Sequence, residues 1–335
     1  MKILFTSYFF SPSIGGIETV SEALALEFVR AGHEVRLVTT TRNSDLISRP
    51  FEVIRAPGPV TLLKLTRWAD VVFQNNISLE LAWPLFVVRR PWIVAHQVWL
   101  NSVSGPGKWR FRLKNLLLRF ACNASISRPI AEALPVPSVV IGNPYEAAIF
   151  KIRPEIARTR ELVYLGRLVS DKGVDLLLQA LAELRKWDMR PRLTIIGSGP
   201  EEDGLKAMAD HLQIADQIEF TGSKKGEDLV RILNQHQIMV IPSRWAEPFG
   251  IVALEGIACG CALVASRLGG LPEAVGPCGI FFEAGNAKAL ADALLKALTV
   301  PHFREDLQRE AQTHLEPFTP FNVAQRYLRL FEGTL

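Results

Sequence analysis

Short apolar runs alternate with amphipathic helical patterns along the whole chain. Residues 2 to 7 read as a buried strand, 18 to 31 as an amphipathic helix and 34 to 40 as a second strand. Further apolar runs of strand length lie at 71 to 73, 92 to 95 and 139 to 141. Because strands separated by helices usually pair in parallel, this alternation predicts an α/β fold with doubly wound parallel sheets.

The alternation occurs twice, with a break between the two series. A polar, proline-containing stretch runs from Asn143 to about Arg160, and strand patterns restart at Leu162. With 335 residues, 48% of them hydrophobic, the chain has enough material for two cores of ordinary domain size. We therefore expect one Rossmann-like domain over residues 1–150 and a second over 151–315. A ligand site is expected in a cleft between two such sheets.

The segment from Glu247 to Glu255 is the strongest functional signal, and it reads Glu-Pro-Phe-Gly-Ile-Val-Ala-Leu-Glu. Pro248 and Gly250 suit the turn before a helix, whose first backbone N–H groups attract anions. In a regular helix Glu255 would lie about two turns beyond Glu247 and within roughly 80° of it. Both carboxylates would then accept hydrogen bonds from hydroxyls of one extended ligand, as in a nucleotide-sugar site.

A second functional signal is the loop from Gly166 to Gly173, which carries Arg167 and Lys172. It follows the apolar run 162–165 and precedes a helical pattern. Loops that follow parallel strands lie at the carboxyl edge of a sheet, where open α/β sheets bind ligands. An arginine and a lysine at that edge can neutralise a diphosphate.

Each of these features also has a purely structural interpretation. Glu247 can stabilise the start of a helix electrostatically, and Glu255 can be a solvated helix residue. Arg167 and Lys172 can belong to an ordinary solvated loop. The combination of the two segments, rather than either alone, favours the nucleotide-sugar interpretation.

Together these segments resemble the retaining glycosyltransferases of the GT-B fold, specifically glycosyltransferase family 4. The resemblance runs along nearly the whole chain and includes short segments at 11–18, 31–35, 141–145, 195–200, 241–243 and 268–273. It implies a GT-B architecture, with two Rossmann-like doubly wound parallel-sheet domains facing a central cleft. It also implies that the helical pattern at residues 316–335 packs back on the first domain.

The resemblance implies a role for each residue of the two segments. Glu247 would bind hydroxyls of the donor sugar, and Glu255 would hold the nucleotide ribose. Arg167 and Lys172 would stabilise the negative charge that grows on the leaving diphosphate, in place of the divalent metal that other transferases use. The backbone of Phe249, Gly250 and Ile251 would add N–H donors to sugar and phosphate.

Three residues of the first domain are further candidates. Gly15 and Gly16 form a turn after the first strand, where the backbone can approach the diphosphate or the acceptor, although a turn that needs positive φ would explain them equally well. His96 ends the run Trp92-Ile93-Val94-Ala95 and is expected at the carboxyl end of a parallel strand. The family often places a histidine there, near the reacting sugar. Here Gln97 follows it where many relatives carry an aspartate, which weakens the case for a carboxylate that orients the ring.

Positive charge is concentrated in the first half of the chain. Residues 1 to 150 contain 16 Lys or Arg against 10 Asp or Glu, and residues 151 to 335 contain 22 against 24. Five basic residues lie at 108–120, where Trp109, Leu113, Leu116, Leu117 and Phe120 would form one apolar stripe on a helix. That pattern predicts either an interfacial helix on an anionic membrane or a core-facing stripe with a basic exposed side. No nucleic-acid motif accompanies the charge, so nucleic acid is not an expected partner.

Other features limit the classes of protein. No apolar run reaches the roughly 18 residues of a membrane-spanning helix, and the first residues enter a strand without a signal-peptide pattern, so we expect a cytoplasmic protein, peripheral on the inner membrane face if residues 108–120 bind lipid. The four cysteines lack zinc spacing and are expected to be reduced. No Asp-x-Asp sequence is present to recruit a metal, so we expect neither a metal nor another cofactor.

The function implied by the resemblance is transfer of a sugar from a UDP-, GDP- or ADP-linked donor to an acceptor hydroxyl, with the anomeric configuration kept. The acceptor would be a polysaccharide or lipid-linked glycan. Two alternatives stay open, a non-catalytic nucleotide-sugar-binding or scaffold protein and a GT-B nucleotide-sugar epimerase. Residues 41–60 and 97–110 are the segments expected to shape the acceptor site.

Overall fold

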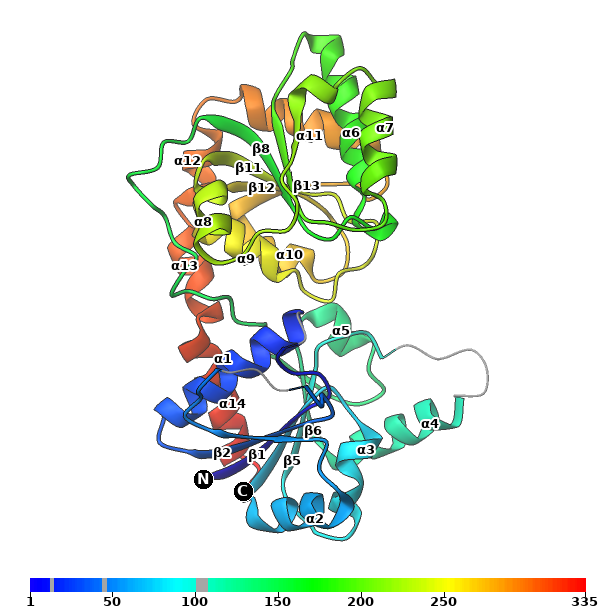
Figure 1. The fold of residues 1–335 in the computed structure, drawn as a ribbon, viewed down its shortest axis with the longest axis vertical. Coiled ribbons are helices and arrows are strands. Elements are labelled where there is room, and N and C mark those ends of the chain that lie inside the picture. Colours follow the sequence, from blue (N-terminus) through cyan, green and yellow to red (C-terminus); the bar gives the residue numbers. More distant parts are fainter. Residues whose placement is uncertain (13–14, 44–46, 101–107) are drawn as a thin grey trace. The chain divides into compact units, whose positions relative to one another are not determined.

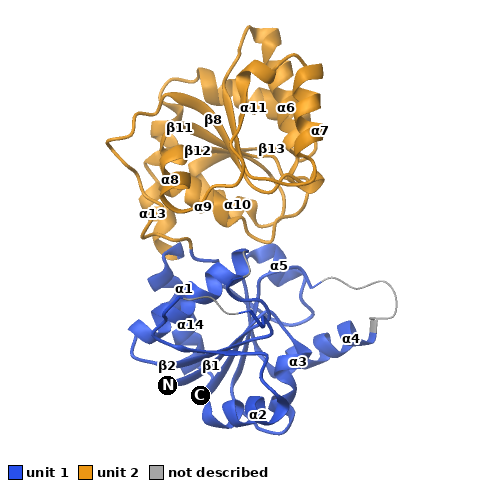
Figure 2. Cartoon of the chain, viewed as in Figure 1, with its two compact units in different colours: residues 1–144, 318–335 blue, residues 145–317 orange. Residues whose placement is uncertain are grey.

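The computed structural model describes residues 1–12, 15–43, 47–100 and 108–335, and these form two compact units (Figures 1 and 2). Unit 1 comprises Met1–Pro144 and Phe318–Leu335, and unit 2 comprises Tyr145–Pro317. The divisions lie a few residues from the expected boundaries at 150 and 315. Parts of the segments 11–18, 41–60 and 97–110 fall outside the described residues.

Unit 1 is built on a parallel sheet with the strand order β3-β2-β1-β4-β5-β6-β7. The strands are β1 (Lys2–Ser7), β2 (Glu34–Thr39), β3 (Glu52–Arg55), β4 (Val71–Asn75), β5 (Trp92–His96), β6 (Cys122–Ser125) and β7 (Val139–Val140). The helices are α1 (Gly16–Arg30), α2 (Pro59–Trp68), α3 (Leu79–Ala82), α4 (Lys108–Leu117), α5 (Arg128–Glu132) and α14 (Pro320–Glu332). Every paired register in the sheet is parallel.

Unit 2 repeats this architecture with the order β10-β9-β8-β11-β12-β13. Its strands are β8 (Arg160–Leu165), β9 (Leu193–Ile196), β10 (Ile218–Phe220), β11 (His236–Ile241), β12 (Ala262–Ser266) and β13 (Gly279–Phe282). Its helices are α6 (Val174–Leu184), α7 (Glu202–His211), α8 (Gly226–Asn234), α9 (Ile251–Ala258), α10 (Leu271–Val275), α11 (Ala287–Thr299), α12 (Phe303–Gln308) and α13 (Ala311–Leu315). The expectation of doubly wound parallel sheets is met in both units.

The strand order fixes where each sheet can bind a ligand. In unit 1 the order reverses between β1 and β4, and in unit 2 it reverses between β8 and β11. At such a switch point the loops that follow the two central strands run in opposite directions, which leaves a crevice at the carboxyl edge of the sheet. The loops after β1, β4, β8 and β11 are therefore the places to look for function.

The C-terminal helix α14 belongs to the core of unit 1 and packs against α1. Its buried side chains Tyr327 and Phe331 complete an aromatic cluster with Phe28 and Phe73. The ring centroids of Phe73 and Tyr327 are 4.9 Å apart, and those of Phe28 and Phe331 are 5.4 Å apart. Aromatic pairs at such distances stabilise a core beyond their area of burial.

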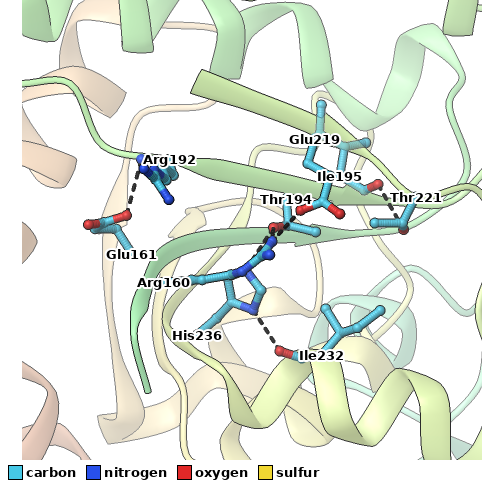
Figure 3. Close-up of polar contacts among 9 residues, drawn as sticks. All are labelled: Arg160, Glu161, Arg192, Thr194, Ile195, Glu219, Thr221, Ile232 and His236. Carbon is cyan, nitrogen blue, oxygen red and sulfur yellow. Dashed lines mark hydrogen bonds and ion pairs between the residues drawn. The ribbon is translucent and has the colours of Figure 1, made fainter. Parts of the chain in front are cut away.

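A buried histidine in unit 2 belongs to a polar cluster that links strands β8, β9, β10 and β11 with helix α8 (Figure 3). His236 Nε2 lies 2.8 Å from Thr194 Oγ1, and its Nδ1 lies 2.6 Å from the carbonyl oxygen of Ile232. Arg160 donates to Thr194 Oγ1 at 3.2 Å and forms an ion pair with Glu219. Burial lowers the pKa of His236 to about 4. The ring is therefore neutral at physiological pH, and it is structural rather than catalytic because it lies at the amino end of β11.

Candidate functional site

The loops after β8 and β11 meet at the switch point of unit 2. The backbone N–H groups of Arg244 and Trp245 donate to the carbonyl oxygen of Asp171 at 2.8 and 3.1 Å. Gly173 has a φ of +69°, and a Cβ there would lie 2.1 Å from the carbonyl oxygen of Pro242. Only glycine fits this left-handed position at so close an approach. Gly173 thus allows the two loops to pack tightly against each other.

This packing brings together two of the predicted site residues, Lys172 and Glu247. The Lys172 ammonium forms an ion pair with Glu247 Oε1, and Ser243 Oγ donates to the same oxygen at 2.8 Å. Both side chains are partly buried, with 27% of Lys172 and 13% of Glu247 exposed. The carboxylate is held from two sides, so its direction is set before any ligand binds.

Arg167, the third charged candidate, follows β8 on the same loop as Lys172. Its side chain is exposed, and within the described part of the chain it has neither an ion pair nor a side-chain hydrogen bond. Its backbone carbonyl accepts a bond from the Tyr164 hydroxyl at 2.9 Å. Burial, together with the charges of Glu247 and Asp171, raises the pKa of Tyr164. The Arg167 guanidinium is thus available for an anionic ligand.

The 247–255 segment departs from the predicted geometry. Glu247 lies in an irregular loop, and α9 begins only at Ile251. The prediction of two carboxylates two helical turns apart is therefore wrong, because the chain is helical over only the second half of the segment. Gly250 precedes α9 with φ +106°, and a Cβ there would lie 2.6 Å from Leu271 Cδ2, so this position requires glycine.

The other candidate residues of the 247–255 segment lie at the start of α9 or within it. Phe249 is buried, with 2% of its surface exposed, and Ile251 is the first helical residue. The N–H group of Ala253 donates to the carbonyl oxygen of Gly250 at 2.9 Å, so the N–H groups of Ile251 and Val252 are the ones suited to an anion. Glu255 lies within α9, where burial and the neighbouring Glu146 raise the pKa of its carboxyl to about 8. Glu255 is therefore largely protonated at neutral pH in the ligand-free chain.

In unit 1, Gly15 and Gly16 lie at the start of α1. Gly15 is extended, with φ −179° and ψ 172°, and Gly16 is the first residue of the helix. The alternative of a turn that needs positive φ is therefore wrong for Gly15, whose extended backbone any residue can adopt. A Cβ on Gly15 would lie 2.6 Å from Glu18 Oε2, the mobile end of a side chain. The backbone conformation at Gly15 would therefore also accept a residue with a side chain.

His96 ends β5, as expected, and only 2% of its surface is exposed. Its Nε2 lies 3.0 Å from Asn123 Oδ1 on the neighbouring strand β6. Asn123 Nδ2 donates to the carbonyl oxygens of Leu118 and Ala121, so Asn123 Oδ1 is the acceptor and His96 Nε2 carries the proton. Burial lowers the pKa of His96. The neutral ring therefore has its Nδ1 lone pair free to accept a hydrogen bond.

Asn123 is a candidate site residue that the sequence did not indicate. Gln97, the residue that follows His96, does not orient the ring in this way. Its backbone N–H donates to Asn76 Oδ1 at 2.7 Å. Asn123 lies 27 positions from His96 and becomes its neighbour only through the register of β5 and β6. The only sequence signal was an asparagine within the four-residue strand β6. An asparagine in a strand does not by itself indicate which side chain it bonds.

We predict that Asn123→Asp raises the pKa of His96 by roughly one unit or more, because a carboxylate beside a histidine favours the charged ring. Nitrogen-15 NMR of the imidazole rings measures both tautomer and pKa. His236 in unit 2 is the internal control and should titrate unchanged. An unaltered His96 titration in this variant would contradict the assigned hydrogen bond.

The apolar stripe predicted at residues 108–120 is divided in the structure. α4 ends at Leu117, which is buried, and Leu113 packs against the core of unit 1. Trp109, Leu116 and Phe120 are exposed. Leu113 and Leu117 thus meet the core, whereas the other three apolar residues of the stripe are exposed, and Phe120 lies beyond the end of α4. No described helix is long and apolar enough to cross a bilayer, and binding of this segment to a membrane surface stays a prediction.

Comparison with known proteins identifies the family. The profile of the family described as Glycosyl transferases group 1 matches residues 146–314, half of the chain. The chain belongs to this family. Among group 1 relatives, it is 27% identical over 376 residues to a glycogen synthase of Mycobacterium tuberculosis, covering 94% of this chain and 90% of that protein. It is 36% identical over 169 residues to a D-inositol 3-phosphate glycosyltransferase of Saccharomonospora viridis, covering 47% and 39% of the two chains.

Solved structures agree with the family assignment at the level of the fold. HepE of Anabaena in complex with UDP matches with a TM-score of 0.84 and 20% identity, over 99% of this chain and all of that one. Sucrose-phosphate synthase of Thermosynechococcus elongatus matches with a TM-score of 0.81 and 20% identity, over 99% and 98% of the two chains. The predicted GT-B fold class and the predicted family are confirmed. The chain is thus a glycosyltransferase, of a family that uses nucleotide-sugar donors.

Proposed function

We propose that this group 1 glycosyltransferase moves a sugar from a nucleotide sugar to an acceptor hydroxyl, with the anomeric configuration kept and without a metal. The observation that carries the proposal is the Lys172–Glu247 ion pair at the switch point of unit 2. It joins a cation suited to a diphosphate with a carboxylate suited to sugar hydroxyls. The partial burial of both side chains and the second contact from Ser243 to Glu247 distinguish this pair from one on a solvated loop.

The charged residues of unit 2 would divide the donor between them. Lys172 and Arg167 hold the diphosphate and stabilise the charge that develops as it leaves. Glu247 accepts hydrogen bonds from hydroxyls of the donor sugar, and Glu255 accepts them from the ribose. The N–H groups at Phe249 to Ile251 supply further donors to phosphate and sugar.

The reaction would proceed at one face of the sugar. The acceptor oxygen bonds to the anomeric carbon as the bond from that carbon to the phosphate oxygen breaks. The hydroxyl proton passes to the leaving phosphate, and the nucleoside diphosphate departs. No carboxylate nucleophile is required. His96, with a free Nδ1, accepts a hydrogen bond from a sugar hydroxyl, and the backbone at Gly15 and Gly16 approaches the diphosphate or the acceptor.

The donor base is the first property to measure. HepE has been solved with UDP and with UDP-glucose, which makes uridine conjugates the first choice, and GDP- and ADP-linked sugars are tested beside them. Acceptors are a polysaccharide fraction and a lipid-linked glycan fraction. The purified chain is incubated with each donor and fraction in EDTA, and proton NMR of the product reads the anomeric configuration.

We expect one donor to give a product with the configuration of the donor, at the same rate with and without EDTA. Inversion would contradict the retaining mechanism, and loss of activity in EDTA would contradict metal independence. Donor conversion without any acceptor would indicate the epimerase alternative. Donor binding without turnover on every fraction would indicate the non-catalytic alternative.

A further inference from the structure

A large cavity in unit 1 lies beyond the carboxyl ends of β1, β4 and β5. Its volume is about 1070 Å³, and its lining comes from the loops after these three strands and from α4. It therefore occupies the switch point of unit 1. Ligand pockets usually measure roughly 300 to 1,000 Å³, so this cavity has room for much more than one sugar ring.

Aromatic rings form much of the lining of this cavity. They are Tyr8, Phe9, Trp99, Trp109 and Phe111. Phe9 is 51% exposed and Trp109 is 59% exposed. Large rings left in water around a concave surface are stabilised when an apolar group covers them. Aliphatic side chains complete the apolar part of the lining, namely Ile17, Ile77, Leu79, Val98 and Leu100. Aliphatic walls offer no hydrogen-bond partner to the hydroxyls of a glycan, so the lining favours a ligand with an apolar chain.

Two cations of α4 also line the cavity. Lys114 is partly buried, and in the described part of the chain it has neither an ion pair nor a side-chain hydrogen bond. Burial and the nearby Arg110 lower the pKa of Lys114. Arg110 lies 5.4 Å from the centroid of the Trp109 ring. Glu80 is the single carboxylate among the described lining residues, so the lining carries net positive charge and is suited to an anionic group.

The floor of the cavity offers hydrogen-bond acceptors at the strand ends. Asn75 is 1% exposed, and its Nδ2 donates to Ser21 Oγ at 2.8 Å. Its Oδ1 has no hydrogen-bond partner among the described residues. His96 lies in the same lining with Nδ1 as an acceptor. Buried acceptors without partners are stabilised by a donor, and a ligand hydroxyl is one.

We propose that this cavity binds the acceptor substrate and that the acceptor is an anionic amphiphile, which carries an apolar chain, a phosphate-like group and a hydroxyl. This inference rests on the proposed glycosyltransferase function and names the acceptor class within it. The aromatic rings cover the chain, Lys114 and Arg110 hold the anion, and Asn75 Oδ1 accepts a hydrogen bond from the hydroxyl. The basic face of α4 thus recognises one amphiphile in a cavity, in contrast to a helix that lies on a bilayer.

The test is a binding titration with farnesyl phosphate below its aggregation concentration, beside farnesol, inorganic phosphate and maltotriose. Tryptophan fluorescence reports the binding, because Trp99 and Trp109 line the cavity. We expect farnesyl phosphate to bind at least tenfold more tightly than each of the other three. Lys114→Gln should weaken the binding of farnesyl phosphate about tenfold, which is the usual contribution of one charge-assisted contact. It should leave the affinity for farnesol unchanged.

Arg112→Gln is the matched control, since Arg112 is an exposed basic residue of the same helix outside the cavity. It should bind farnesyl phosphate as the unmodified chain does. Equal losses of affinity for farnesyl phosphate in the Arg112 and Lys114 variants would overturn the proposal in favour of a general basic surface. Binding of maltotriose more tightly than farnesyl phosphate would overturn it in favour of a glycan acceptor. Nucleotide titration of the same samples separates the two hypotheses. Normal nucleotide binding without farnesyl phosphate binding contradicts only the acceptor class, whereas absent nucleotide binding contradicts the proposed function.

Discussion

Lys172→Ala is expected to lower kcat by about 10²- to 10³-fold, which corresponds to about 2.7 to 4 kcal/mol of transition-state stabilisation. The reason is that negative charge grows on the leaving diphosphate, and the Lys172 ammonium is already held at the switch point by Glu247. An interaction that strengthens as charge develops affects kcat more than donor affinity. Steady-state kinetics with the donor identified by screening would measure both quantities.

Two further variants make the Lys172 experiment specific. Glu247→Ala should cause a comparable loss, because it removes the contact to the donor sugar and leaves the partly buried Lys172 without its partner. Lys186→Ala is the matched control, since Lys186 forms an ion pair with Glu183 on the exposed surface of the same unit. It should retain full activity and an unchanged melting temperature. Full activity of both the Lys172 and the Glu247 variants would refute the proposed site.

Affinity for the nucleotide-sugar donor is expected to rise with pH, by about tenfold per unit between pH 6 and 7.5. Glu255 has a pKa of about 8 in the ligand-free chain, and ribose hydroxyls donate best to the ionised carboxylate. Binding therefore releases a proton, and affinity follows the ionised fraction below the pKa. A nucleotide sugar is the right probe, because its diphosphate does not titrate in this range. Isothermal titration in buffers of different ionisation enthalpy counts the released proton.

The Glu255→Gln variant separates this linkage from other effects of pH. It should bind the donor more weakly at pH 8, with no rise in affinity between pH 6 and 7.5. The folded-state pKa is raised above the model-peptide value of 4.5, so this carboxyl destabilises the fold progressively as pH increases from 4.5 to 8. The ligand-free variant should consequently melt higher than the unmodified chain at pH 8 and equally at pH 4. A pH dependence of donor binding shared by both proteins would assign the proton to another group.

Sequence patterns predicted the elements whose signal is local. The apolar runs at 2–7 and 34–40 correspond closely to β1 and β2, since a strand buried on both faces is continuously apolar. β6 was not predicted, because Cys122–Ser125 carries an asparagine and two small residues in place of a bulky apolar run. β13 was missed for a similar reason, since Gly279–Phe282 is short and begins with glycine.

Predictions that depended on an assumed geometry were less successful. The angle between Glu247 and Glu255 assumed a helix along the whole segment, whereas α9 starts at Ile251. The core-facing interpretation of the stripe at 108–120 placed its five apolar residues in one environment, whereas only Leu113 and Leu117 of the five meet the core. In both cases the environment of the side chains depended on neighbours that local sequence does not contain.

The sequence by itself determined that the chain alternates strands and helices in two series, and it placed Lys172 and Glu247 each just beyond a strand. It determined this because periodicity and loop position are properties of adjacent residues. Only the tertiary structure decided that these two residues form an ion pair across 75 positions, that Asn123 rather than a residue beside His96 sets its tautomer, and that Lys114 lines a cavity. Strand order and register bring these groups together, and both are set by the packing of whole sheets.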